Sequence, residues 1–92
     1  MLKTLEDLIA TIRQRKSSSD VSSYTAKLLK DKSLSVEKVK EEVGELIEAV
    51  ENNSNKVHEA ADVLYHLLVY LEANEIKIED VMQELKNRKK FE

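Results

Sequence analysis

A short polar turn between two acidic helical patterns, within residues 41–66, constrains the fold of this chain most strongly. The turn reads Asn52-Asn53-Ser54-Asn55, and such side chains compete with the backbone for hydrogen bonds, so they favour caps and turns over helix interiors. A connection of this length makes the helices on its two sides antiparallel neighbours. The sequence therefore predicts a helical hairpin.

Each half of this hairpin carries two carboxylates three residues apart: Glu42 and Glu45 before the turn, and Glu59 and Asp62 after it. Residues three apart share one face of a helix. Because each residue adds about 1.5 Å along the helix axis, Glu45 and Asp62 lie at nearly equal heights from the turn. We expect the four carboxylates to converge between the two helices.

The composition indicates an all-α protein in a single domain spanning residues 1–92. The chain has no proline, one glycine and 36% charged residues, which leaves little material for β-turns, whereas its Leu, Glu, Lys and Ala favour helix. A chain of 92 residues buries only roughly 60–65% of the surface that its unfolded form exposes. Dimerisation is therefore a natural source of further burial.

Apolar periodicity predicts helices over residues 2–15, within 22–29, after Ser35 as an N-cap, over 55–73 and after residue 75. The third helix has an apolar stripe, and a second stripe beside it contains Lys38, Glu42, Glu45 and Ala49. In the fourth helix Leu67 and Leu68 belong to the stripe that we expect to face the core. Residues 63–71, VLYHLLVYL, are apolar on nearly every side, which predicts that a second copy covers part of them.

The carboxylates border an apolar face, so they are partly desolvated and feel each other's charge, which favours a bound cation. Oxygen ligands without thiolates select Mg²⁺, with Mn²⁺ as a substitute. Such an ion neutralises charge on a phosphoanhydride, and hydrolysis is the simplest reaction that uses it. The sequence contains no glycine-rich phosphate-binding loop, so the metal and scattered Lys and Arg residues would hold the substrate.

Charge and hydropathy also bear on partners and location. A net charge of −3 argues against a dedicated nucleic-acid binder. No apolar run approaches the roughly 18 residues of a membrane span, and no export signal is evident, so we expect no membrane association. The lack of cysteine fits a reducing compartment, and we expect a cytoplasmic protein.

Two motifs in the hairpin, EEVGE at residues 41–45 and EAADVLYH at residues 59–66, closely resemble the phosphoribosyl-ATP pyrophosphohydrolases of histidine biosynthesis. The spacing of their acidic residues is shared by the wider MazG-like pyrophosphohydrolases. SYTAKLL at residues 23–29 and AADVLYHLL narrow the resemblance to the phosphoribosyl-ATP branch. Lys40 and Lys77 depart from the family's usual glycine and capping Ser or Thr, and neither is a proposed ligand.

The resemblance implies a MazG-like bundle of four to five helices, completed by homodimerisation, with further pairing of dimers left open. It implies Mg²⁺-dependent hydrolysis of phosphoribosyl-ATP to phosphoribosyl-AMP and pyrophosphate, the second step of histidine biosynthesis. The implied metal ligands are Glu42, Glu45, Glu59 and Asp62, and Glu41 completes the catalytic set in a supporting role. Candidate substrate-binding residues are Tyr24, Thr25, Lys27, Lys38 and His66.

Two alternatives stay open at this stage. One is a house-cleaning pyrophosphatase of the MazG type that acts on ordinary or damaged nucleoside triphosphates with the same metal. The other is a non-catalytic helical dimerisation module, because acidic residues at helical intervals are common on solvated faces. His66 alone is more often a half-buried structural residue than a ligand, and Tyr65 and Tyr70 are more typical of packing.

Overall fold

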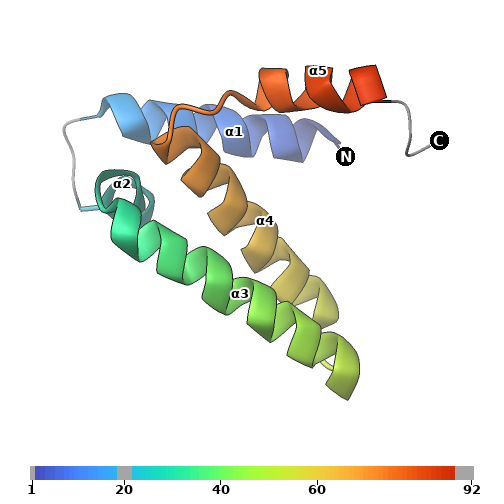
Figure 1. Ribbon diagram of the computed structural model, residues 1–92. Helices are drawn as coiled ribbons and strands as arrows, with labels where there is room; N and C mark the ends of the chain where they lie inside the picture. The colour runs from blue at the N-terminus through green and yellow to red at the C-terminus, as the bar shows by residue number, and fades with distance from the viewer. Residues whose placement is uncertain (1, 19–21, 89–92) are drawn as a thin grey trace.

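The computed structural model describes residues 2–18 and 22–88, and within them the fold is entirely helical (Figure 1). The five helices of these residues are α1 (Leu2–Ser17), α2 (Tyr24–Lys30), α3 (Lys32–Asn52), α4 (Lys56–Ala73) and α5 (Ile78–Arg88). The prediction of an all-α protein is confirmed. None of the described helices is both long and apolar enough to cross a membrane.

Helices α3 and α4 form the predicted antiparallel hairpin and make the most extensive contact between any two helices (Figure 1). Asn53 and Asn55 adopt left-handed backbone conformations, with φ of 53° and 54°, which asparagine tolerates better than most residues. The Asn53 N–H donates to the carbonyls of Ala49 and Val50 and so closes the last turn of α3. The asparagine-rich turn thus reverses the chain within a few residues.

The junction between α2 and α3 differs from the prediction. Ser23 caps α2 by accepting a hydrogen bond of 3.0 Å from the Ala26 N–H. The prediction that Ser35 caps the next helix is wrong, because Asp31 accepts from the Leu34 N–H at 3.0 Å and α3 begins at Lys32. Asp31 is at once the C-cap of α2 and the N-cap of α3, so no loop separates these helices, and Ser35 is buried inside α3.

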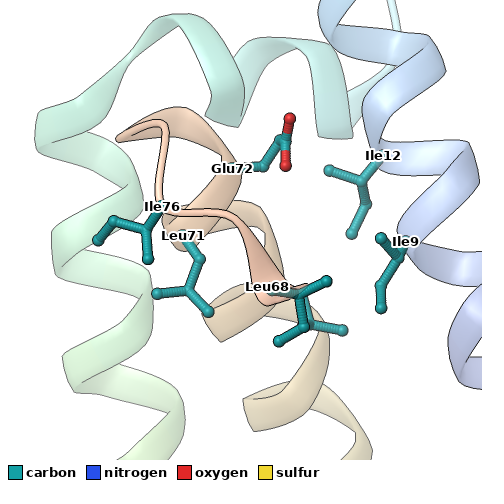
Figure 2. A pocket seen from close by; sticks show the side chains of 7 residues that line it. Ile9, Ile12, Leu68, Leu71, Glu72 and Ile76 are labelled. Carbon is teal, nitrogen blue, oxygen red and sulfur yellow. The ribbon is translucent and has the colours of Figure 1, made fainter. Parts of the chain in front are cut away.

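The core lies where α1, α2 and α4 meet. Its buried members are Ile12, Leu28, Leu29, Leu68, Val69 and Ala73. Figure 2 shows Ile9 and Ile12 of α1 near Leu68 of α4, around a cavity of about 10 Å³. This is no more than the space that one water molecule requires, so the cavity is a packing gap and not a ligand site.

The apolar stripes of the hairpin are only partly buried in a single chain. Leu68 is buried as predicted, but Leu67 is 38% exposed, so its assignment to the core is wrong for one chain. On α3, likewise, the face with Glu42 and Ala49 is buried, whereas the apolar stripe beside that face is exposed. Large apolar side chains are therefore exposed along the hairpin: Val43, Ile47, Val50, Val57, Leu64 and Leu67.

Ion pairs fasten α1 to the end of α4 and the beginning of α5. Arg13 donates to both carboxylate oxygens of Glu79, at 2.9 and 2.6 Å, and this hydrogen-bonded pair lowers the pKa of Glu79 to about 2. Lys16 donates to the backbone carbonyl of Glu72 at 2.9 Å. Helix α5 has no buried residue of its own, so these contacts and the partly buried Ile78 hold it beside α1.

Candidate metal centre

The structure brings Glu42 and Glu45 of α3 together with Glu59 and Asp62 of α4, as their spacing predicted. Glu42 is the most deeply placed, with 8% of its surface exposed. Burial raises its pKa to about 7, and the hydrogen bond to Glu45 and the charges of Glu45, Asp62 and Glu59 act in the same direction. All four carboxylates therefore lie within electrostatic reach of one another.

Glu59 meets the same environment from the opposite helix. Its pKa is raised, first by burial and then by the charges of Glu45 and Asp62, whereas the neighbouring His58 opposes the shift. Glu45 thus lies beside the buried Glu42 and the partly buried Glu59 and links the two helices. Repulsion of this kind is unfavourable unless protons or a cation balance it.

Two oxygen atoms in the cluster also lack hydrogen-bond partners. The Oε2 atoms of Glu42 and Glu59 are buried, and neither has a partner within residues 2–18 and 22–88. A buried acceptor without a partner costs about 1–3 kcal/mol, and more when it is charged. A divalent cation between α3 and α4 would satisfy both oxygens and offset the like charges. The donors are carboxylate oxygens, which fits Mg²⁺ or Mn²⁺.

The spatial grouping adds one residue that the sequence interpretation missed. Oxygen atoms of Glu41, Glu42 and Glu45 lie within 4.8 Å of one another, and the same holds for ligand atoms of His58, Glu59 and Asp62. The Nε2 atom of His58 lies 3.4 Å from an Asp62 carboxylate oxygen. The signal for this contact was present in the sequence, since His58 precedes Asp62 by four residues on one helix.

Polar and aromatic side chains from α2, α3 and α4 lie next to the carboxylate cluster. The Tyr24 hydroxyl lies 3.0 Å from Nε2 of His66, and the hydroxyls of Thr25 and Tyr65 are hydrogen-bonded. Lys38 pairs with Glu41 at 3.6 Å, and its pKa is raised by the nearby charges, with Glu41 first and Tyr24 second. Tyr24, Lys38 and His66 of the candidate substrate-binding set thus lie near the acidic cluster, whereas Thr25 contacts Tyr65, the neighbour of His66 on α4.

Lys27, the fifth candidate, is placed differently. It lies in the last turn of α2 with an exposed side chain, and no hydrogen bond or ion pair within the described residues joins it to the cluster. His66 is close but only 7% exposed, and both of its ring nitrogens are engaged by protein atoms. The structure therefore favours Tyr24 and Lys38 over Lys27 and His66 as groups that reach a substrate.

At the turn end of the hairpin, the cluster opens into a cavity of about 280 Å³. Its lining residues are Glu45, Glu48, Ala49, Asn52, Ser54, Asn55 and Glu59. This end offers carboxylates and amides, whereas the α2 end offers the cation of Lys38. The two ends of the site therefore differ in charge, and an anionic group is best accommodated at the α2 end.

This chain is similar in sequence to the members of a known protein family. Residues 5–89 match the family described as phosphoribosyl-ATP pyrophosphohydrolase. A phosphoribosyl-ATP pyrophosphatase of Ruegeria pomeroyi is 48% identical over 90 residues, which cover 95% of this chain and 86% of the relative.

Further relatives carry the same name. The phosphoribosyl-ATP pyrophosphatase of Roseobacter denitrificans is 47% identical over 91 residues, covering 92% of this chain and 84% of the relative. That of Haloarcula marismortui is 39% identical over 90 residues, covering 92% of both chains. The matches thus extend over nearly the whole of each protein. The chain belongs to the phosphoribosyl-ATP pyrophosphohydrolase family.

Proposed function

We propose that this protein hydrolyses phosphoribosyl-ATP to phosphoribosyl-AMP and pyrophosphate, the second step of histidine biosynthesis, with Mg²⁺ or, as a substitute, Mn²⁺. The observation that carries the proposal is the pair of buried, unpartnered oxygens of Glu42 and Glu59 inside a four-carboxylate cluster. The names of the relatives support the choice of substrate. A cytoplasmic location stays a prediction from the sequence.

In this proposal, Glu42, Glu45, Glu59 and Asp62 are the metal ligands. The bound ion would lower the pKa of a water molecule and neutralise charge on the phosphoanhydride. Glu41 has a supporting role, because its carboxylate lies 3.6 Å from the ammonium group of Lys38 and holds that cation beside the cluster.

The overall reaction adds one water molecule across the α–β phosphoanhydride. The oxygen of the water forms a bond to phosphorus, the bond to the bridging oxygen breaks, and pyrophosphate leaves with protons released to solvent. Lys38 supplies a positive charge for the phosphate chain, and the half-exposed Tyr24 forms the neighbouring wall. These side chains orient the substrate so that the scissile bond lies against the carboxylates.

We also propose that the active unit is a homodimer in which a second copy covers the apolar face of the hairpin. Ile47 of α3 and Leu64 of α4 are 56% and 53% exposed, and they lie on helices whose other faces carry the metal ligands. Val43, Ile47 and Val50 share one face of α3 by their spacing and are all exposed, and such a row of apolar side chains marks an interaction site more often than free surface. Covering this face would also remove water from the back of the site.

The decisive experiment is product analysis with purified protein and phosphoribosyl-ATP. We expect equal amounts of phosphoribosyl-AMP and pyrophosphate, loss of both with EDTA, and recovery on addition of excess Mg²⁺. A parallel series with the common deoxynucleoside triphosphates addresses the house-cleaning alternative. If these are cleaved with a much higher kcat/KM than phosphoribosyl-ATP, the proposed substrate is wrong.

A further inference from the structure

The buried imidazole of His66 connects two parts of the site that are far apart in the chain. Its Nδ1 atom lies 2.8 Å from the backbone carbonyl of Asp62, one turn earlier on α4. Its Nε2 atom lies 3.0 Å from the hydroxyl of Tyr24, in the first turn of α2. The imidazole of His66 therefore contacts both the backbone of Asp62 and the side chain of Tyr24.

The partners of the two nitrogens determine which one carries the proton. A backbone carbonyl only accepts hydrogen bonds, so Nδ1 of His66 must be the donor to Asp62. In the neutral ring Nε2 is then an acceptor, and the Tyr24 hydroxyl donates to it. The hydroxyl has one proton, which is used in this bond, so its remaining lone pairs are free to accept from a cation or from water.

The neighbours of Tyr24 indicate the role of its hydrogen bond with His66. Tyr24 acts on the pKa of Lys38, and Lys38 acts on that of Tyr24, so the two side chains lie within electrostatic reach of one another. Tyr24 also packs with a ring of α4: its ring centroid is 6.4 Å from that of Tyr65, with the planes nearly parallel. The tyrosine is thus held by Tyr65 and His66 of α4, and 46% of its surface is exposed to solvent.

We propose that His66 is a positioning residue: by holding the Tyr24 hydroxyl, it fixes the tyrosine and the neighbouring Lys38 as the phosphate-binding side of the site. The inference rests on the proposed hydrolysis of phosphoribosyl-ATP and assigns to His66 an indirect role. His66 does not touch the substrate. Its loss weakens substrate binding and leaves the metal-binding carboxylates in place.

Two near-isosteric variants separate the two hydrogen bonds. His66→Gln places an amide oxygen near the Nε2 position and keeps an acceptor for Tyr24. His66→Asn places an amide N–H near the Nδ1 position, keeps the donor to Asp62, and loses the acceptor. Tyr24→Phe removes the hydroxyl that donates to His66 and leaves the imidazole unchanged. In this variant the hydrogen bond between Thr25 and Tyr65 still joins α2 to α4.

We expect Tyr24→Phe and His66→Asn each to raise the KM for phosphoribosyl-ATP about three- to ten-fold, the size of one neutral hydrogen bond, with kcat nearly unchanged. The double variant should be no worse than either single one, because both remove the same bond. His66→Gln should stay close to the wild type. Tyr70→Phe, which removes a tyrosine hydroxyl elsewhere on α4, is the matched control and should not change KM. Calorimetry should give the same Mg²⁺ affinity for all variants.

A second measurement does not depend on activity. Long-range ¹H–¹⁵N NMR of the metal-free protein should show the His66 proton on Nδ1, and Tyr24→Phe should shift the Nε2 resonance. Three results would each overturn the inference. They are a His66 proton on Nε2, a His66→Gln variant as impaired as His66→Asn, and a fall in kcat at constant KM in Tyr24→Phe or His66→Asn. Wild-type protein that fails to cleave phosphoribosyl-ATP would refute the proposed function instead, and the NMR result would then decide the role of His66.

Discussion

The carboxylate of Glu42 is buried beside that of Glu45 at the contact between α3 and α4, and this arrangement keeps the pKa of Glu42 near 7 instead of its usual 4.5. Two like charges in a partly desolvated site repel each other, so the metal-free protein favours a proton where the active protein would hold a cation. Proton binding and metal binding should therefore compete at the same residues.

The first prediction follows from that competition. A carboxyl whose pKa is raised in the folded state stabilises the protein fully below its unfolded pKa and loses this contribution as the pH rises through its folded pKa. For Glu42 the window is from about 4.5 to about 7, and the raised pKa of Glu59 acts in the same direction. Metal-free protein should melt at a lower temperature at about pH 8 than at about pH 6.

Two controls accompany these melts. Glu42→Gln, which has no charge to lose, should flatten the pH dependence, and Mg²⁺ should raise the melting temperature of the wild type most at the higher pH. A metal-free wild type that becomes more stable across this range would show that Glu42 is not the buried proton-binding group described above.

The second prediction concerns the residues that link the helices. Glu45→Gln and Asp62→Asn should lower metal-dependent turnover by about 100-fold or more, since even outer-shell partners of a metal typically contribute 10- to 100-fold. The metal-free variants should melt no lower than the wild type, because each removes a repelling charge. Glu51→Gln, on an exposed position of α3, is the control and should leave both quantities unchanged. Clear destabilisation of both metal-free variants would mean that these carboxylates are structural.

The third prediction tests the homodimer. Ile47→Glu or Leu64→Glu places a charge on the exposed apolar face of the hairpin. An unpaired charge buried in an interface costs about 3 kcal/mol or more, so light scattering should detect monomers at micromolar concentration. Met82→Glu, at a half-exposed apolar position on α5, should leave the dimer intact. A wild-type protein that is monomeric and fully active under the same conditions contradicts the proposed assembly.

The fourth prediction concerns the core. Leu28 of α2 is fully buried among residues of α1 and α4, so Leu28→Ala should lower the free energy of unfolding by about 2–5 kcal/mol. Urea denaturation provides the measurement. Leu2→Ala, at an exposed position in the first turn of α1, should change stability by no more than about 0.5 kcal/mol. Equal effects of the two variants would be inconsistent with the packing of α2 as the centre of the core.

The hairpin and the meeting of its carboxylates were predictable because local signals determine them. The asparagine turn fixes the chain reversal, and the three-residue spacing of Glu42 and Glu45 fixes a shared face. The N-cap of α3 was missed because Asp31 caps two helices at once, whereas the sequence interpretation chose Ser35 as the N-cap.

Which stripe of α3 becomes buried could not be predicted in the same way. On α3 the apolar and acidic stripes are adjacent, and only the docking of α4 decides that Glu42 is covered while Ile47 stays exposed. The contact between Tyr24 and His66 joins residues 42 positions apart, so no local pattern indicates it. Both features depend on packing between residues that are far apart in the chain. The spacing of residues within one helix gives no information about such packing.

Calorimetric titration of Mg²⁺ into the metal-free protein tests the central claim, that the four carboxylates of α3 and α4 form a divalent-cation site. The protein should be held at a pH above the raised pKa of Glu42, so that protons do not compete with the ion. We predict saturable binding by the wild type and by Glu51→Gln, and its loss in Asp62→Asn. Wild-type protein that binds Mg²⁺ no better than Asp62→Asn would contradict the claim and favour a non-catalytic helical module.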